Sequence, residues 1–342
     1  MKKFISIIMA LFFALTLFGC GGSKKESAVN SKNGKEYKIA YMTDTYGAEE
    51  SFNKQVIEGI NESFGNYEYS LDIYTPKTNT EYESMATSVL SASQYDLVVS
   101  NSSAVCSALL AAQSEYSGSN LGFIGYNDET NNAMSITFKN EEAAFLAGVL
   151  AALETKSNVL GYVGAYNDRD LDYEYGFLSG VKAVNSKIKV KKEYINSYMS
   201  AEEAEKVAEK LYNEKADVVF TVCGAGAIGV NNVAKEKGFK VIDSDLYNKS
   251  DNEIKLAQIN KDYKSAVISI CDAVIFESYS KSCSDLSVLD SVIDLKLNQN
   301  FFDQSSNEYT TIEKVKKDMA TKNLVIPTDE KSFKAFKYNI ND

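Results

Sequence analysis

The chain has 342 residues, which is too long for one ordinary hydrophobic core and favours two domains. Hydrophobic residues make up 44% of the chain and charged residues 24%, a balance typical of a globular protein. The net charge of −11 and the absence of a long basic run argue against nucleic acid as a partner, because phosphate neutralisation needs clustered Lys and Arg.

The sequence contains no histidine. It therefore lacks the commonest general base and zinc ligand, and it cannot form a Ser-His or Cys-His nucleophile. An enzyme built on carboxylates or lysine is compatible with this composition. We nevertheless expect a protein that is not an enzyme, with no catalytic residue, no metal site and no cofactor.

The N-terminal stretch MKKFISIIMALFFALTLFGC has a basic start, an apolar run and a small Gly19 before Cys20. An apolar run of this length without a charged stop-transfer flank is typical of a signal peptide. The letters LFGC resemble a lipobox, at which bacterial prolipoproteins are cut and the new N-terminal cysteine is lipidated. We expect a lipoprotein signal peptide over residues 1–19 and acyl chains, palmitate included, on Cys20. A simple secretory signal with an accidental cysteine is the alternative.

Residues 20–36 are rich in Gly, Ser and Lys and have little apolar content, which predicts a flexible tether. The acyl chains would then hold the protein at the extracytoplasmic face of the cell membrane, and membrane contact is expected only through this anchor. Beyond Cys20 there is no CxxC pair, so a dithiol or metal motif is not supported. Free thiols on buried faces are favoured over disulfides for the four later cysteines, Cys106, Cys223, Cys271 and Cys283.

From Tyr37 onward, short apolar runs alternate with helical patterns. The runs are rich in β-branched and aromatic residues, as buried parallel strands are. Strands are predicted over 37–43, 69–75, 95–100, 121–126, 158–164, 188–194, 217–222 and 239–244. Between them, apolar residues recur at helical spacing, as Ala204, Val207, Ala208, Leu211 and Tyr212 do.

This alternation of strands and helices runs twice, roughly over 37–138 and 143–247, and predicts an α/β protein with two doubly wound parallel-sheet lobes. Because the chain should cross between the lobes more than once, we expect discontinuous domains. Lobe 1 is expected over 37–138 plus about 256–288, and lobe 2 over 139–255 plus about 289–342. Ligands of doubly wound sheets bind beyond the carboxyl ends of the strands, so a hinged cleft between the lobes is the predicted site.

The residues that follow the predicted strands include aromatic, acidic and amide side chains and a lysine. They are Asp44, Phe52, Asn53, Asn127, Asp128, Tyr173, Gly224, Asp243 and Lys261. A flat ligand could stack between Phe52 and Tyr173, one ring from each lobe. Carboxylates accept hydrogen bonds from vicinal hydroxyls and repel phosphate, so these residues favour a neutral nucleoside over a nucleotide.

Each of these residues also has a purely structural interpretation. Ser51 could cap a helix while Phe52 packs on the strand, and VIDSD, which contains Asp243, could be a strand end with an Asp N-cap. The glycines at 224, 226 and 229 resemble GxGxxG, but a lone match late in the chain is weak, and helix packing or close backbone approach explains them better. Lys261 could be a solvated surface lysine.

Several stretches resemble the basic membrane protein family, the substrate-binding lipoproteins of nucleoside ABC importers. They are TDTYGAEESFN, SITFKNEEAAFLAGVLAAL, GYVGAYNDRDLDYEYGFLSGVKAVN, VCGAGAIGV and VIDSD. The resemblance covers nearly all of the chain after the signal peptide and implies a type I periplasmic-binding-protein fold. It also implies an ABC permease and an ATPase as partners.

The resemblance further implies a purine nucleoside between the rings of Phe52 and Tyr173. Base contacts would come from Asn53 and from Asn127 or Asp128. Ribose contacts would come from Asp243 and Lys261 with Gly224 close by, and Asp44 matches the family aspartate of the first loop. The chain departs from the family in having Tyr46-Gly47 where a Gly-Gly pair is usual. A receptor for a sugar or another small solute, a signalling or adhesive surface lipoprotein and a carboxylate-based nucleoside hydrolase are the alternatives.

Overall fold

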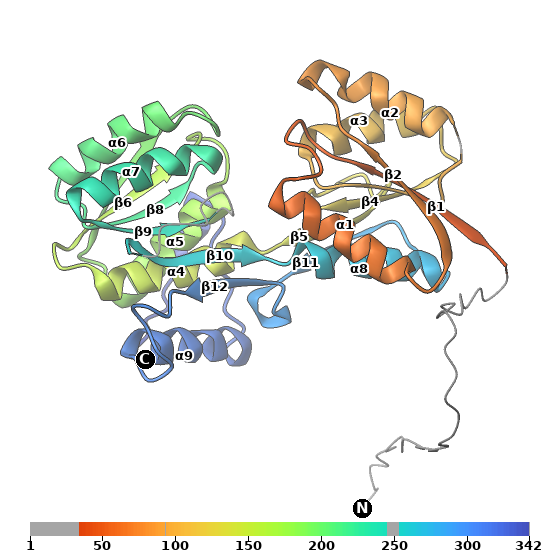
Figure 1. Cartoon of the computed structure of the whole chain (residues 1–342). Helices are drawn as coiled ribbons and strands as arrows, with labels where there is room; N and C mark the ends of the chain where they lie inside the picture. The colour runs from red at the N-terminus through yellow and green to blue at the C-terminus, as the bar shows by residue number, and fades with distance from the viewer. Residues whose placement is uncertain (1–33, 93, 245–252, 342) are drawn as a thin grey trace, which may run out of the picture.

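The computed structural model describes residues 34–92, 94–244 and 253–341, and these form two lobes joined side by side (Figure 1). The expected signal peptide, the expected lipidation site Cys20 and most of the expected tether lie outside the described residues. Within the described part of the chain, no helix is both long and apolar enough to cross a membrane.

The first lobe is built on a sheet of six described strands, in which every neighbouring pair is parallel. In spatial order these are β11 (Ser282–Leu286), β5 (Met134–Phe138), β4 (Asn120–Ile124), β3 (Leu97–Ser100), β1 (Glu36–Met42) and β2 (Glu68–Tyr74). The flanking helices are α1 (Ser51–Phe64), α2 (Tyr82–Ser91), α3 (Ser103–Gln113) and α8 (Tyr263–Ile275), with a 3-10 turn η1 (Asn79–Glu81) before α2. Ile39 and Tyr41 of β1 face α1 and α8, whereas Ala40 and Met42 face α2 and α3.

The second lobe has a mixed sheet, again of six described strands. In spatial order these are β12 (Ile293–Leu297), β10 (Lys255–Lys261), β9 (Lys240–Asp243), β8 (Val218–Val222), β6 (Val159–Gly164) and β7 (Lys189–Tyr194). Only the pair β10–β12 is antiparallel among them. The helices are α4 (Asn140–Glu154), α5 (Leu171–Val184), α6 (Ala201–Asn213), α7 (Ala227–Lys237), α9 (Asn307–Thr321) and α10 (Glu330–Ala335), with 3-10 turns η2 (Gly224–Gly226) and η3 (Val288–Asp290).

The chain passes between the two sheets after β5, after β10 and after β11, and Figure 1 shows these strands where the lobes join. Strand pairing assigns β10 to the second sheet, because it bonds in parallel to β9 and antiparallel to β12. The expectation that lobe 1 resumes at about residue 256 is therefore corrected for residues 256–261. The helix α8 and the strand β11 that follow pack with the first sheet.

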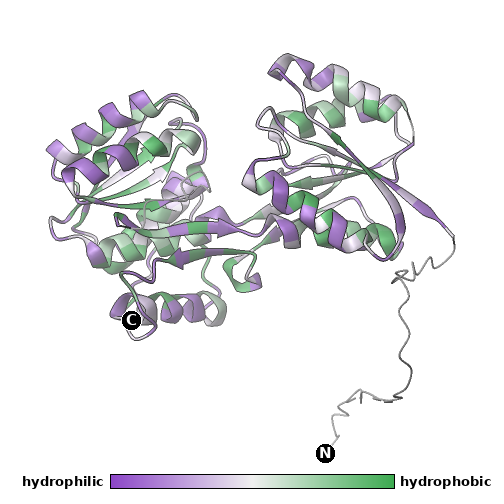
Figure 2. Cartoon of the chain, viewed as in Figure 1, coloured by the Kyte–Doolittle hydropathy of each residue, from purple (hydrophilic) through white to green (hydrophobic). Residues whose placement is uncertain are grey.

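Close packing of α4 against α5 fixes the start of α5, where Tyr173 lies. A Cβ at Gly180 would lie 2.0 Å from the carbonyl oxygen of Phe145, and one at Gly148 would lie 2.1 Å from that of Phe177. Only glycine permits helix backbones to approach this closely. Figure 2 shows the resulting layers, with hydrophobic strands and inner helix faces under polar outer helix faces.

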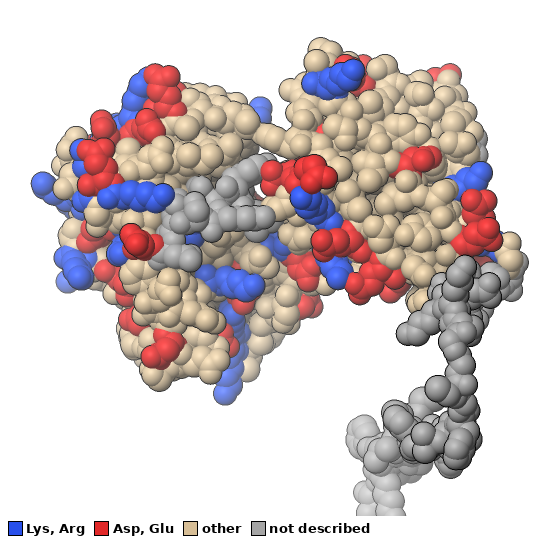
Figure 3. Space-filling view, in the orientation of Figure 1, with Lys and Arg blue, Asp and Glu red and all other residues tan. Residues whose placement is uncertain are grey.

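Figure 3 shows Lys and Arg side chains interspersed with Asp and Glu over the visible face of both lobes. This mixture contrasts with the continuous basic stripe that proteins use to follow a nucleic-acid backbone. Cys106, Cys223 and Cys271 are buried free thiols and Cys283 is a partly buried one, as the sequence favours.

Candidate functional site

The segment after β1 is organised around the amide of Asn53, which has no exposed surface. Its Oδ1 accepts hydrogen bonds from Tyr41 Oη at 2.6 Å and from Asn101 Nδ2 at 3.1 Å. Its Nδ2 donates to the carbonyl oxygen of Gly47 at 2.8 Å and to Asp44 Oδ1 at 3.3 Å. A side-chain amide has two donors and two acceptor sites, so all four are in use. In this structure Asn53 therefore holds the loop, and a base that contacts it would have to replace one of these bonds.

Asp44 stands at the exposed edge of this network. It is partly buried, and its Oδ1 also accepts a hydrogen bond from the backbone N–H of Tyr46 at 3.1 Å. Burial raises the pKa of Asp44 above its ordinary value, although the hydrogen bonds from Asn53 and Tyr46 oppose this rise. The helix α1 that follows is capped by Glu50, whose carboxylate accepts from the backbone N–H of Ser51 at 2.7 Å. The interpretation of Ser51 as the N-cap is therefore wrong.

Aromatic rings and one ammonium group connect the two lobes, and we call this set the interlobe row. The partly exposed ring of Phe52 lies 6.2 Å from that of Tyr263, which lies 5.5 Å from that of Phe138. The Nζ atom of Lys261 is 5.6 Å from the centre of the Phe138 ring and 5.2 Å from that of Tyr173. The row thus brings Phe52, Lys261 and Tyr173 into one connected set that spans the lobes.

Tyr173 forms the second-lobe end of this row and is only 5% exposed. Its ring packs at 6.4 Å against Phe220 in the core of the second lobe. The ammonium of Lys261 lies over this ring in a cation–π contact, which rules out the solvated-surface interpretation of that lysine. A ligand that stacks on Tyr173 must therefore share the ring with Lys261 or move its side chain.

Asp243 ends β9 and is completely buried. Its carboxylate accepts from Thr221 Oγ1 at 2.7 Å and from Asn231 Nδ2 at 3.3 Å, and it forms an ion pair with Lys255 Nζ at 2.8 Å. A carboxylate has about four acceptor sites, so these three bonds leave room for one more. Asn231 Oδ1 is buried and has no hydrogen-bond partner among the described residues.

Thr221, Asn231 and Lys255 were not predicted from the sequence. Lys255 opens the apolar strand KLAQIN, and only 8% of its side chain is exposed. A lysine in such a strand needs a buried acid as a partner. The Asp243–Lys255 pair could therefore have been predicted from the sequence by looking for the acidic partner of this lysine.

Asn127 and Asp128 differ in accessibility. Asp128 is 3% exposed and accepts backbone hydrogen bonds from Thr130, Asn132 and Ala133 at 3.0, 2.5 and 2.9 Å. Burial raises its pKa, but these bonds and the one from the Thr130 hydroxyl outweigh it and lower the pKa overall. The Asp128 carboxylate thus organises its own loop, and Asn127 is the exposed member of the pair.

Gly224 lies where β8 leads into α7, and its φ of 57° is in the left-handed region. A Cβ there would be 2.7 Å from the carbonyl oxygen of Tyr198, and the backbone N–H of Gly226 donates to that oxygen at 3.3 Å. A Cβ at Gly229 would be 2.0 Å from the carbonyl oxygen of Ala201 at the start of α6. The interpretation of these glycines as positions of close backbone approach is confirmed for Gly224 and Gly229, which lie against Tyr198 and Ala201.

A second polar cluster at the strand ends of lobe 2 was missed by sequence reasoning. Tyr198 Oη donates to Asp170 Oδ2 at 2.7 Å, and its ring meets that of Tyr166 edge-on at 5.4 Å. The guanidinium of Arg169, the one arginine in the chain, lies 4.6 Å from the Tyr166 ring centre. This cluster ties the β6–α5 loop to the β7–α6 loop.

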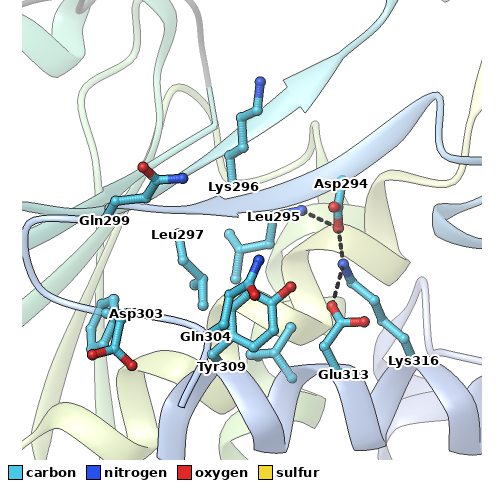
Figure 4. Close-up of a pocket in the computed structure, with 12 residues that line it drawn as sticks. Asp294, Leu295, Lys296, Leu297, Gln299, Asp303, Gln304, Tyr309, Glu313 and Lys316 are labelled. Atoms are coloured by element: carbon cyan, nitrogen blue, oxygen red, sulfur yellow. Dashed lines mark hydrogen bonds and ion pairs between the residues drawn. The ribbon is translucent and has the colours of Figure 1, made fainter. Parts of the chain in front are cut away.

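A cavity of about 470 Å³ lies away from these residues, between β12 and α9 (Figure 4). At one end Lys316 pairs with Asp294 at 2.6 Å and with Glu313 at 3.2 Å. None of the nine predicted site residues lines it. Among the described residues, no three His, Cys, Asp or Glu side chains gather where they could hold a metal ion.

Glu141 in the first turn of α4 provides a titrating group beside the lobe junction. Burial raises its pKa to about 7, and the charges of Asp172 and Glu142 add to this rise while Lys139 opposes it. The folded chain therefore holds a proton on Glu141 more tightly than the unfolded chain, where the ordinary pKa is 4.5. This proton stabilises the fold at low pH, and the stabilisation is lost as pH rises from about 4.5 through 7.

We expect Glu141→Gln to remove this component of the pH dependence. Between pH 5 and 8 the free energy of unfolding of the unaltered chain should fall by roughly 1–3 kcal/mol more than that of the variant. Urea denaturation at both pH values measures the difference, and Glu129→Gln, at an exposed glutamate, is the matched control. Parallel pH profiles for Glu141→Gln and the unaltered chain would refute the assignment.

A family model described as ABC transporter substrate-binding protein PnrA-like matches residues 37–330. The chain is 32% identical over 245 residues to the ABC transporter nucleoside-binding protein BmpA of Lactococcus lactis, with 69% of each chain covered. It is 29% identical over 240 residues to the CD4+ T-cell-stimulating antigen of Listeria innocua, covering 68% of this chain and 67% of that one. It is 25% identical over 351 residues to basic membrane protein B of Borreliella burgdorferi, covering 96% and 97%.

Among solved structures, an ABC transporter solute-binding protein from Aeropyrum pernix superposes with a TM-score of 0.71 at 16% identity, covering 87% of this chain and 96% of that one. One from Conexibacter woesei superposes with a TM-score of 0.69, also at 16% identity, covering 85% and 99%. At this level of identity the likeness shows the fold alone. The two doubly wound lobes therefore form a type I periplasmic-binding-protein fold, as the sequence predicts.

Proposed function

Because the chain belongs to the PnrA-like, or basic membrane protein, family of ABC transporter substrate-binding proteins, we propose that it captures a purine nucleoside and delivers it to a permease. We further propose that it is anchored at the extracytoplasmic face of the cell membrane by a lipid on Cys20. On this proposal the chain makes and breaks no bond, and ATP hydrolysis belongs to a partner subunit.

The interlobe row is the observation that carries the proposal. It aligns Phe52 of the first lobe with Lys261 and Tyr173 at the edge of the second through ring and cation–π contacts. Aromatic rings stack on a base with about 1–3 kcal/mol each. An ammonium donates hydrogen bonds to hydroxyl oxygens, so Lys261 suits a ribose that reaches across the junction. Both lobes would then contribute affinity, and the ligand would favour the closed arrangement.

Acidic side chains around the row support a neutral solute over a phosphorylated one. Asp44 lies at the strand ends of the first lobe, and Asp170 and Asp243 lie at those of the second. The negative charges of Asp44 and Asp170 repel phosphate, whereas the charge of Asp243 is already balanced by Lys255. The remaining acceptor site of Asp243 suits a ribose hydroxyl that enters when the lobes close. We therefore assign the same nine residues as the ligand-binding set, with Asn53 and Asp128 acting by shaping their loops.

Thermal denaturation in the presence of candidate solutes tests the proposal. A purine nucleoside at about 100 times its dissociation constant should stabilise the fold by about 2.7 kcal/mol, which corresponds to a Tm increase of about 4 °C. Inosine, guanosine and adenosine should raise Tm, whereas the matching monophosphates should not. A rise with free sugars and none with nucleosides would replace the proposal by a sugar receptor on the same fold.

A further inference from the structure

We propose that Asn231 is a further ligand-binding residue, whose side-chain oxygen and the carboxylate of Asp243 accept hydrogen bonds from two adjacent hydroxyls of the solute. The inference rests on the proposed function and deepens it, because a ribose carries two adjacent hydroxyls and a deoxyribose does not. Asn231 lies in the second turn of α7, and Asp243 ends the strand β9. The site therefore selects ribonucleosides over their deoxy analogues.

The amide of Asn231 is held in one orientation by Asp243. Asn231 is 1% exposed, and its Nδ2 donates to Asp243 Oδ2 at 3.3 Å. Turning the amide over would place its oxygen against the carboxylate, where two acceptors repel each other. The Oδ1 atom therefore lies on the other side of the amide, and there it has no hydrogen-bond partner among the described residues.

An unpaired buried acceptor costs about 1–3 kcal/mol, so its presence in a fold needs a reason. Other buried side-chain atoms in the described part of the chain also lack a partner, and most of these are serine hydroxyls. Among them, Asn231 is the residue that is hydrogen-bonded to a predicted ligand-binding residue. An acceptor that the protein leaves unpaired beside a ligand-binding carboxylate indicates that the solute supplies the donor.

The groups around Asp243 determine which donor fits. Its Oδ2 atom accepts from Asn231 Nδ2 and from Lys255 Nζ, the latter at 2.8 Å. Its Oδ1 atom accepts from the Thr221 hydroxyl at 2.7 Å and has room for a second donor. The Lys255 ammonium balances the charge of the carboxylate, so a cationic donor gains little there. Neutral hydroxyls fit best, and because the two groups are hydrogen-bonded to each other, hydroxyls on adjacent carbons can reach both.

Burial makes this pair of acceptors selective. Asp243 is completely buried and Asn231 nearly so, and the hydroxyls reach them only as the cleft rearranges around the solute. An analogue that lacks one hydroxyl then leaves a buried acceptor unpaired. Sites built to bind a hydroxyl through hydrogen bonds reject such analogues strongly, whereas apolar pockets do not. We expect the loss of either hydroxyl to weaken binding about ten- to hundredfold.

Isothermal titration calorimetry of the intact chain with inosine, 2′-deoxyinosine and 3′-deoxyinosine tests the inference. The unaltered chain should bind inosine about ten- to hundredfold more tightly than either analogue. Asn231→Leu keeps a branched side chain without the acceptor and should weaken inosine binding by a similar factor. It should bind one of the two analogues as tightly as the unaltered chain does, because that analogue lacks the hydroxyl that Asn231 binds.

Asn232→Leu is the matched control. Asn232 is the next residue on α7, but it is exposed and its amide donates to Glu205 Oε1 at 3.0 Å. This variant should bind all three nucleosides as the unaltered chain does. Circular dichroism checks that each variant is folded at the assay temperature, and Asn231→Ala, which cannot overpack, replaces Asn231→Leu if the latter is not.

The pattern across the three nucleosides distinguishes failure of the inference from failure of the proposed function. If Asn231→Leu binds inosine as the unaltered chain does, or weakens all three nucleosides by the same factor, the residue has at most a structural role and the inference is overturned. Equal affinity of the unaltered chain for inosine and either analogue also overturns it, while the nucleoside proposal stands. If the unaltered chain binds none of the three, the proposed function fails and the inference fails with it.

Discussion

Asp243→Ala is expected to lower the free energy of unfolding by about 3–5 kcal/mol, because it removes one partner of a buried ion pair. Asp243 is fully buried, and only 8% of the Lys255 side chain 2.8 Å away is exposed. The substitution also deprives the Thr221 hydroxyl of the acceptor that it reaches at 2.7 Å. For a chain of this size the loss corresponds to a Tm decrease of about 4–7 °C.

Urea denaturation followed by circular dichroism measures this loss. Glu49→Ala is the matched control, since the Glu49–Lys54 pair has the same 2.8 Å separation but an acid that is 89% exposed, and no change in Tm is expected there. The double variant Asp243→Asn, Lys255→Met should be more stable than Asp243→Ala, because it removes both charges together. A loss below about 1 kcal/mol for Asp243→Ala would show that the pair is not buried as described.

This expectation of a buried ion pair differs from the ligand contact and the capping role that the sequence suggests for Asp243. A strand-end aspartate looks the same in both cases. The two cases differ in the role of Lys255, because the parallel pairing of β10 with β9 brings this lysine beside Asp243. Ligand affinity of Asp243 variants should therefore be compared at temperatures where each variant is fully folded.

Local patterns predicted the strands β1 to β4 and β6 to β9, but not β5 or β12. Runs such as DVVFTV and YDLVVS consist mostly of residues that suit a strand covered on both faces, and β8 and β3 begin directly after their aspartates. The edge strand β11, with the sequence SCSDL, was missed because it is largely polar and only partly buried. Residues 256–261, which belong to β10, were expected in lobe 1, since an apolar run does not specify which sheet it joins.

Reasoning from the ends of the predicted strands selected the residues of the candidate site, but it did not give the orientation of their side chains. Asn53 and Asp128 follow strands as expected, yet their polar atoms are used by their own loops. The partners of Asn53 lie 6 to 48 residues away along the chain, and no local pattern encodes them. Those of Asp128 lie only 2 to 5 residues further on, as is common for an aspartate in a turn.

Phe52→Ala is expected to weaken purine nucleoside binding by roughly ten- to hundredfold, the effect of losing one stacked ring. The fold should persist, because the Phe52 side chain is partly exposed and the core residues of α1 are Val56, Ile60 and Phe64. The substitution also removes the neighbour of Tyr263 and of Tyr46, so it interrupts the interlobe row at its first-lobe end.

Isothermal titration calorimetry with inosine or guanosine measures the change, and Phe52→Tyr should restore most of the affinity because it keeps the ring. Phe276→Ala is the control, since that ring follows α8 in the first lobe and is 68% exposed.

The interlobe row also predicts that substitutions at its two ends have different effects. Tyr173 is buried against Phe220, so Tyr173→Ala should reduce stability as well as affinity, whereas Phe52→Ala should reduce affinity alone. Unchanged affinity in Phe52→Ala would remove the stacking ring from the site, and the nucleoside proposal would lose its main physical support.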